Sequence, residues 1–181
     1  MTVQIDPAIR NLCAIALALI FGASGAIKLR DVEMFEGSLA NYRLAPIWME
    51  KPLAYVFPLL ECAGALGLLV HSQRTTAATL LLALLIAFTG AIAINLARGR
   101  RNIDCGCFGP ALRQELSGWL LARNTFLMII ATVTLLSPNG RALEPLDIVA
   151  VVVGAMVMVT LYASANIAIA NAPKLRALEA M

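Results

Sequence analysis

The sequence predicts an all-α integral membrane protein, a helical bundle of about five transmembrane helices with a short interfacial helix after the first. Apolar residues make up 60% of the 181 positions, against roughly 45–50% in an ordinary soluble domain. The 14 basic and 11 acidic residues lie mostly between long apolar runs. In a soluble domain, one face of each helix or strand meets water, and charged residues would therefore recur among the apolar ones at helix or strand period. Both observations indicate that most of the chain lies in lipid.

Five apolar runs are long enough to cross a bilayer, whose hydrocarbon core of about 30 Å requires roughly 20 helical residues. Continuous runs favour helices over barrel strands, which would alternate over about ten residues. Only Lys28, Glu61 and Arg123 among the charged residues fall inside the runs, and we expect Lys28, near an end, to reach the head groups. The sequence therefore predicts a single transmembrane domain over residues 1–181, with spans at about 12–29, 53–70, 77–97, 119–136 and 148–170.

The first run has a second interpretation, as a cleavable signal peptide, because small residues at positions 22–26 follow its apolar core. However, Asp6 offsets Arg10 in the leading region, which lacks the positive charge usual for such peptides. Lys28 and Leu29 also continue the segment past any cleavage site. A transmembrane helix is therefore the favoured interpretation.

The connection between the first two runs predicts a short amphipathic helix at the membrane interface. Its apolar residues recur at helical spacing: Val32, Phe35, Leu39 and Tyr42. Pro46 would end the helix, and Trp48 would anchor the chain at the head groups. A surface helix packed against the bundle is the alternative.

The candidate chemistry lies before the fourth run, where Cys105 and Cys107 flank a single glycine. Two thiols at this spacing can close a small strained disulfide, and strained disulfides are the more oxidising ones. Pro110 suits the first turn of a helix, so we expect the pair just ahead of a helix N-terminus. There the dipole and nearby arginines favour thiolate. Cys105 and Cys107 are therefore the predicted catalytic residues, with Cys107 as the attacking thiol.

Two other interpretations of the cysteine pair stay open, as half of a metal site or as inert thiols. A closed zinc site needs four ligands, yet the only histidine, His71, falls on the opposite membrane face when the spans are counted. No metal is therefore assigned, although a two-thiolate soft-metal site is compatible with the pair. Cys13 and Cys62 lie within spans and are expected to act as small hydrophobic residues.

Polar residues in the spans predict a supporting site beneath the cysteines. Glu61 lies about 12–13 Å into its span, where an ionised carboxylate costs about 2.5–3.5 kcal/mol. It therefore needs a partner, and Arg123 is long enough to reach it. Counting spans places these polar residues near one membrane face: Lys28, Glu61, Asn95, Arg123 and Asn124. They either hold helices together or form a polar pocket that holds a quinone head group or relays protons.

Several motifs together resemble the MauE family of methylamine utilisation membrane proteins, over about residues 10–136. They are Lys28-Leu29, Tyr42 with Leu44-Ala45-Pro46, Pro58-Leu59-Leu60-Glu61, Arg98-Gly99-Arg100, Asp104-Cys105-Gly106-Cys107-Phe108-Gly109 and Arg123-Asn124. The resemblance implies a role in the processing, transport or maturation of the methylamine dehydrogenase small subunit, with a thioredoxin-like MauD-type protein as partner. The broad plan is also similar to DoxX-like proteins and to the vitamin K epoxide reductase family. This sequence differs from the latter in its C-x-C spacing and in lacking a cysteine pair in the first long loop.

Two arguments give opposite predictions for the membrane face that carries the cysteines. Ten Lys and Arg residues lie on the cysteine face and three on the other, so the positive-inside rule places the cysteines in the cytoplasm. An exported client instead requires them outside, where disulfides persist. We expect a multi-pass protein of the inner membrane with the cysteines outside, whose partners include the bilayer and, given a net charge of +3, no nucleic acid.

The leading hypothesis is a redox-active accessory protein that introduces or isomerises disulfides in an exported dehydrogenase subunit. The alternative is a membrane transporter or chaperone that binds a soft metal or the unfolded client without redox chemistry.

Overall fold

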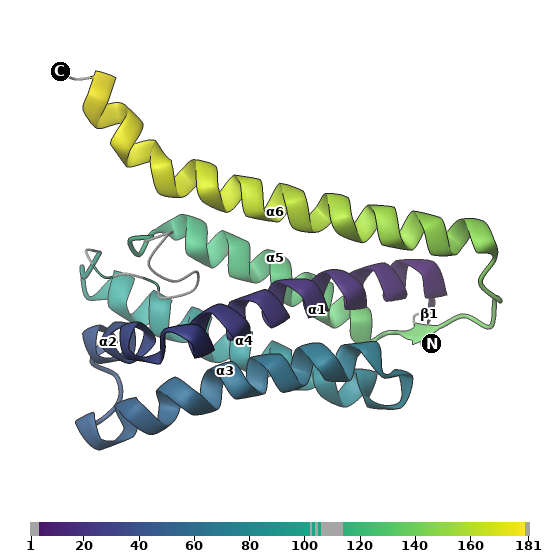
Figure 1. The fold of residues 1–181 in the computed structure, drawn as a ribbon, viewed down its shortest axis with the longest axis horizontal. Helices are drawn as coiled ribbons and strands as arrows, with labels where there is room; N and C mark the ends of the chain where they lie inside the picture. The colour runs from purple at the N-terminus through teal and green to yellow at the C-terminus, as the bar shows by residue number, and fades with distance from the viewer. Residues whose placement is uncertain (1–3, 102, 104, 106–113, 180–181) are drawn as a thin grey trace.

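The computed structural model describes residues 4–101, 103, 105 and 114–179. It confirms an all-α bundle, in which long helices lie side by side along one direction (Figure 1). Five helices are long and apolar enough to span a membrane. They are α1 (Pro7–Arg30), α3 (Ile47–Leu69), α4 (Arg74–Ala97, preceded by the short 3₁₀ helix η1, His71–Gln73), α5 (Gly118–Leu135) and α6 (Pro145–Glu179).

Each predicted span overlaps one of these helices, but α1 and α3 begin markedly earlier than expected. Helix α1 starts at Pro7, since the Asp6 carboxylate caps it by accepting from the Ala8 N–H at 2.8 Å and proline suits the first helical position. Helix α3 starts at Ile47, directly after the extended Pro46. The prolines inside α3 do not break the helix. Each leaves a backbone group without its helical hydrogen bond, and neighbouring helices in a bundle can satisfy that group.

The short helix expected between the first two spans is present as α2 (Val32–Tyr42). Asp31 caps it by accepting from the Met34 N–H at 3.1 Å, and Arg43 ends it in the left-handed conformation, φ 48°. Its inner face buries Phe35, Ser38 and Tyr42, and it packs against α3 and α1. Trp48 is exposed in the first turn of α3.

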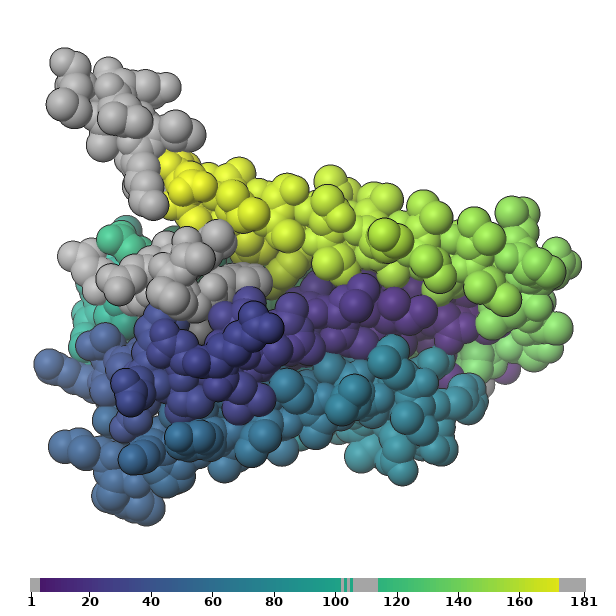
Figure 2. All heavy atoms as spheres, viewed as in Figure 1, coloured from purple at the N-terminus to yellow at the C-terminus, as the bar shows by residue number. Residues whose placement is uncertain are grey.

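Helix α1 is the centre of the bundle, because it packs against α3, α5 and α6. The main apolar core joins α1, α3, α4 and α5 through such residues as Leu17, Leu68, Leu81 and Leu127. Helix α6 runs along the flank next to α1 (Figure 2), and only 11% of its candidate span is buried. The outer face of α6 is therefore apolar and open, as expected for contact with lipid.

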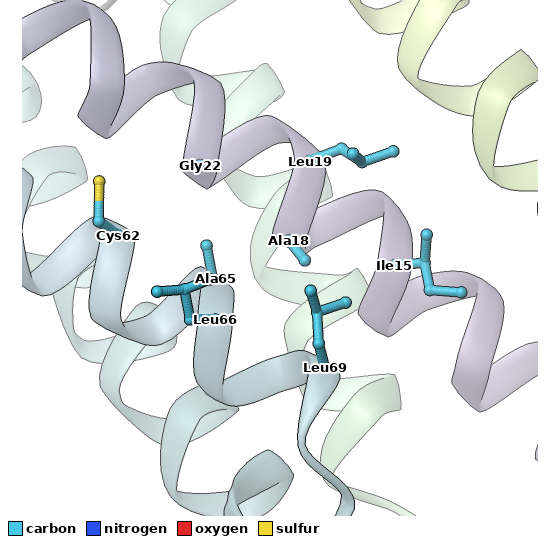
Figure 3. A pocket seen from close by; sticks show the side chains of 8 residues that line it. All are labelled: Ile15, Ala18, Leu19, Gly22, Cys62, Ala65, Leu66 and Leu69. Atoms are coloured by element: carbon cyan, nitrogen blue, oxygen red, sulfur yellow. The ribbon is translucent and has the colours of Figure 1, made fainter.

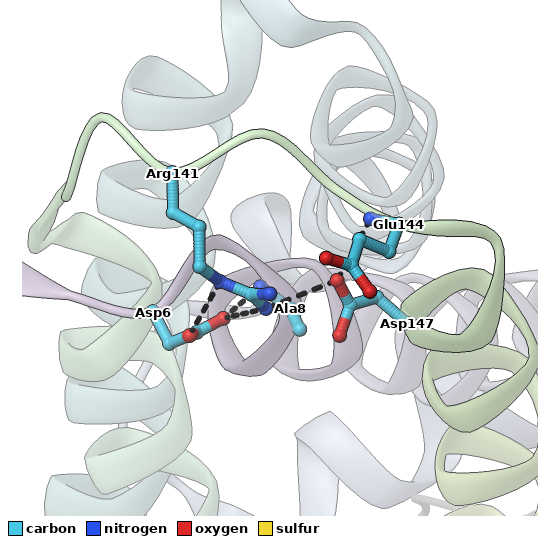
Figure 4. A network of polar contacts seen from close by, with 5 residues as sticks. All are labelled: Asp6, Ala8, Arg141, Glu144 and Asp147. Carbon is cyan, nitrogen blue, oxygen red and sulfur yellow. Dashed lines mark hydrogen bonds and ion pairs between the residues drawn. The ribbon is translucent and has the colours of Figure 1, made fainter.

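At the end of the bundle opposite α2, an ionic network joins the start of the described chain to the segment between α5 and α6. Strand β1 (Gln4–Ile5) pairs in parallel with β2 (Ser137–Pro138). Arg141 donates hydrogen bonds to Asp6 and forms an ion pair with Asp147 at 3.0 Å (Figure 4). The Ala8 N–H and then the Arg141 guanidinium hold the pKa of Asp6 below its ordinary value, and the two carboxylates raise the pKa of Arg141. The network fastens the start of α1 to the segment before α6.

Candidate functional site

A buried ion pair joins α1 to α3. Lys28 Nζ lies 2.5 Å from Glu61 Oε1, and both residues are almost completely buried, with 4% and 1% of their surface exposed. Two expectations were therefore wrong: Lys28 does not extend to the head groups, and Glu61 pairs with Lys28 in place of Arg123. The local reason is Gly25, which lacks a side chain where α1 meets the Pro58 carbonyl and Glu61.

The Lys28 ammonium group also lies against two aromatic rings. Its Nζ is 5.0 Å from the ring centroid of Phe35 and 5.0 Å from that of Phe88. A cation over an aromatic face is attracted by the ring quadrupole, more strongly where water is absent. One carboxylate and two rings thus surround the ammonium group and hold it inside the bundle.

Arg123 of α5 occupies the centre of a second group of polar contacts. Its guanidinium donates to the side-chain oxygens of Asn124 (3.2 Å), Gln114 (3.4 Å) and Asn166 (3.2 Å). Its Nη2 lies 3.9 Å from Cys105 Sγ. The planar fork of arginine suits such multiple contacts. Arg123 therefore links Cys105 to α5 and α6.

The ion pair and Arg123 line one small cavity of about 40 Å³. Its polar lining residues are Ser24, Lys28, Glu61, Arg123, Asn124 and Tyr162. Glu61 Oε2 is buried and has no hydrogen-bond partner in the part of the chain that the structure describes. The cavity is polar and large enough to hold ordered water.

The predicted polar residues separate into two places. Lys28, Glu61, Arg123 and Asn124 line the polar cavity, as the polar-pocket interpretation requires. Asn95 is also buried but serves the end of α4: its amide donates to the Ala91 carbonyl at 3.1 Å, and its Oδ1 accepts from Arg100 at 3.2 Å.

Sequence reasoning missed several members of the site: Ser24, Gln114, Tyr162 and Asn166. The available signal was Asn166, an amide inside the predicted fifth span, since polar residues inside spans usually face the bundle interior. It is buried, and its backbone carbonyl also accepts from the Gln114 amide at 2.9 Å. Helix α6 therefore contributes to the site.

Cys105 is buried, with 6% of its surface exposed, and it is disulfide-bonded. Its backbone N–H donates to the Gln114 carbonyl at 2.9 Å. Cys107 and the helix start expected at Pro110 lie outside the described residues. Cys13 and Cys62 are free thiols, Cys13 within the apolar core and Cys62 partly exposed.

Two other hollows are lined mainly by apolar side chains. One, of about 290 Å³, lies between α1 and α3 beside Cys62 (Figure 3) and shares no lining residue with the polar cavity. The other, of about 170 Å³, lies among α2, α3 and α4, with Cys105 in its wall. Phe88 lines both this apolar cavity and the polar cavity, so the two are neighbours.

Comparison with known proteins points to one family. Residues 6–137, from α1 to the end of α5, match the family model described as methylamine utilisation protein MauE. Methylamine utilization protein MauE of Paracoccus denitrificans is 42% identical over 127 residues, 70% of this chain and 68% of that protein. The proteins of the same name from Methylorubrum extorquens and Paracoccus versutus are 36% and 35% identical, covering 82% and 83% of this chain and 80% and 81% of theirs. No solved structure matches.

Proposed function

The chain belongs to the MauE family of methylamine utilisation proteins, and from this premise we propose that it is a redox-active accessory protein of the inner membrane. In this proposal it exchanges disulfides at Cys105 and Cys107 during maturation of the methylamine dehydrogenase small subunit. Its direct thiol partner is a thioredoxin-like protein of the MauD type, which passes the oxidising equivalents to the client.

The observation that carries this proposal is the contact between Arg123 and Cys105. The guanidinium lies 3.9 Å from Cys105 Sγ, and both side chains are buried. A thiolate formed at Cys105 is therefore stabilised by a fixed positive charge in a buried site. Such a thiolate is a good leaving group in thiol–disulfide exchange.

The burial of Cys105 supports different roles for the two cysteines. Burial makes Cys105 a poor target for a bulky protein thiol, so we assign the mixed disulfide to Cys107, and Cys105 is the thiolate that Arg123 stabilises. A partner thiolate attacks Cys107 Sγ, the Cys105–Cys107 bond breaks, and Cys105 leaves as thiolate. The partner's second thiolate then attacks the mixed disulfide. The partner loses two electrons and becomes a disulfide, and the cysteine pair gains them.

The test uses single serine variants in cells that produce the dehydrogenase and the thioredoxin-like partner. Cys105→Ser leaves Cys107 as a single thiol, which attacks the disulfide of an oxidised partner molecule and releases that partner's second thiolate. The covalent adduct through Cys107, visible on a non-reducing gel and lost with reductant, should then accumulate, because Cys105 is not there to displace the partner and close the internal disulfide. Cys107→Ser should give no adduct and no active dehydrogenase. Cys62→Ser, a change at a free cysteine outside the site, is the control and should behave as wild type.

Two results would count against the proposal. Active dehydrogenase in both serine variants would show that the pair has no essential redox role. Loss of maturation with no adduct in either variant would favour the transporter or chaperone that binds a soft metal or the client.

A further inference from the structure

The apolar cavity of about 170 Å³ beside Cys105 has the features of a binding site for a flat ring. We propose that it binds the ring of a membrane-soluble quinone, which reoxidises the cysteine pair after each exchange. This inference rests on the proposed thiol–disulfide function, because it supplies the oxidant that the function needs.

The volume of the cavity fits one substituted ring. An apolar protein cavity of about 150 Å³ accepts a benzene molecule, so about 170 Å³ accommodates a six-membered ring with small substituents. The polar cavity around Glu61, at about 40 Å³, is too small for one. A quinone head group is therefore assigned to the apolar cavity, while the polar cavity has room only for water.

The walls of the apolar cavity are aromatic on several sides. Phe35 comes from α2, Phe57 from α3 and Phe88 from α4. The rings of Phe57 and Phe88 have centroids 5.1 Å apart and are tilted by 59°. Aromatic side chains in tilted or offset arrangements bind a further flat ring favourably. Since these walls come from three helices, the bundle holds them in place without a ligand.

The lining also offers polar contacts for the ring and an exit for its tail. Ser38 and Tyr42 contribute hydroxyl groups. The Ser38 hydroxyl donates to the Met34 carbonyl at 3.1 Å, and a hydroxyl rotates to serve another acceptor such as a quinone oxygen. Leu44 and Ala87 line the cavity and are exposed, so an isoprenoid tail can leave the cavity between them.

The position of Cys105 in the wall gives the site its chemistry. In the reduced protein, Cys105 and Cys107 carry two S–H bonds. Both break, an S–S bond forms, and the two electrons and two protons pass to the quinone, which becomes a quinol. The quinol then exchanges with quinone in the membrane. The cysteine pair is thereby restored as a disulfide for the next partner molecule.

Binding is tested on the purified full-length protein in detergent with a decyl-substituted p-benzoquinone. Quenching of tryptophan fluorescence reports binding, since Trp119 packs against the cluster that contains Cys105. Ala91→Phe places a ring in the cavity and should weaken binding at least tenfold. Ala93→Phe, the same change on the exposed side of α4, is the matched control and should bind as wild type. Ala45→Leu fills the cavity from the α2–α3 connection if Ala91→Phe fails to fold.

Redox coupling is tested on wild-type protein reduced with a dithiol and freed of the reductant. The quinone should restore the disulfide with one quinol formed per protein, whereas Cys107→Ser, which leaves Cys105 without a partner thiol, should form no quinol. Equal binding by wild type and both cavity variants would overturn the site, as would displacement of the quinone by phospholipid alone. Absence of quinone binding in protein that still forms the mixed disulfide would overturn this inference and leave the proposed function standing.

Discussion

Glu61 and Lys28 form an ion pair, with 2.5 Å between Oε1 and Nζ, that is buried between α3 and α1. Burying two charges costs several kcal/mol for each ion, which their attraction offsets only when geometry and hydrogen bonding are good. Here Glu61 Oε2 has no hydrogen-bond partner among the described residues. We therefore interpret the pair as a contact that fixes how α1 and α3 pack beneath Cys105, and not as a source of net stability.

The first prediction concerns removal of one charge of this pair. Glu61→Gln should lower the free energy of unfolding in detergent by about 3–5 kcal/mol, because it leaves the Lys28 ammonium buried without its counter-ion. Glu50→Gln, in the partly exposed first turn of the same helix, is the control and should change stability by less than about 0.5 kcal/mol.

A double-mutant cycle identifies the partner. Glu61→Gln combined with Lys28→Met should cost much less than the sum of the single changes, whereas Glu61→Gln and Arg123→Gln should couple more weakly. Stronger coupling to Arg123 than to Lys28 would contradict the pairing in the structure.

The second prediction concerns the close approach of the same helices at Gly25. A Cβ at this position would lie 2.7 Å from Cys62 Sγ and 2.9 Å from the Pro58 carbonyl oxygen, and the backbone oxygen cannot move independently. Gly25→Ala should therefore destabilise the protein by about 1–3 kcal/mol, measured by unfolding in detergent. Gly90→Ala in α4 has open space around the added methyl group and should be neutral or stabilising. Equal effects of the two changes would refute the contact.

The spans were predictable from the sequence because hydrophobicity along a run is a local property. The helix starts at Pro7 and Ile47 were not, since capping and tolerance of proline depend on neighbouring groups. The same limit applies to Glu61. Sequence gives its depth in the span, but both Lys28 and Arg123 approach from the same end of the bundle. The packing of α1 against α3 places Lys28, and not Arg123, in ion-pair distance of it.

The sequence failed to predict the contribution of α6 to the site for a different reason. The sequence argument included amides of the third and fourth spans, Asn95 and Asn124, but no residue of the fifth. In the structure, Asn166 of α6 accepts from Arg123 at 3.2 Å. An amide in an apolar helix is a weaker signal than a charge, yet it marks the same kind of buried polar contact. The cysteine pair, by contrast, is a local motif, so it could be proposed as a candidate site without knowledge of the fold.

The third prediction tests the electrostatic role of Arg123. After reduction, Cys105 should react with a small thiol reagent at neutral pH about tenfold more slowly in Arg123→Gln than in wild type. The reason is that a charge about 4 Å from a buried thiolate contributes at least 1 kcal/mol. The assay uses the Cys107→Ser background, so that Cys105 is followed alone. Arg101→Gln removes an exposed arginine near Cys105 in sequence and should leave the rate unchanged. An equal slowing in both would indicate a general charge effect.

The fourth prediction concerns acid and the network around Asp6. Because its pKa is lowered in the folded protein, its charge stabilises the fold fully above the unfolded value of about 3.9. That contribution is lost as pH falls through the lower folded value. Asp6→Asn keeps a capping side chain but not the charge, so its Tm should lie below that of wild type at pH 6, with the gap narrowing as pH falls below about 3.9. A gap that does not narrow at all as the pH is lowered would assign the effect to capping, and Glu33→Gln is the exposed control.

The last prediction concerns which membrane face carries the cysteines. The excess of basic residues at this end argues for the cytoplasm, but Arg100 donates to the Asn41 carbonyl at 3.0 Å and to Asn95 Oδ1 at 3.2 Å. It therefore has a structural role that accounts for its presence independently of topology. Cys105 itself is too buried to report sidedness, so exposed positions at the two ends are used instead.

Asn41→Cys at the end of α2 and Ser72→Cys in η1 each place a thiol at an exposed position, in a chain with serine at 105 and 107. The proposed export of the client predicts that an impermeant thiol reagent labels Asn41→Cys in intact spheroplasts. Ser72→Cys should be labelled only after permeabilisation, because one span, α3, separates the two positions. The reverse pattern would place Cys105 and Arg123 at the cytoplasmic end. Disulfides do not persist in that compartment, and the maturation of an exported subunit by this cysteine pair would then be excluded.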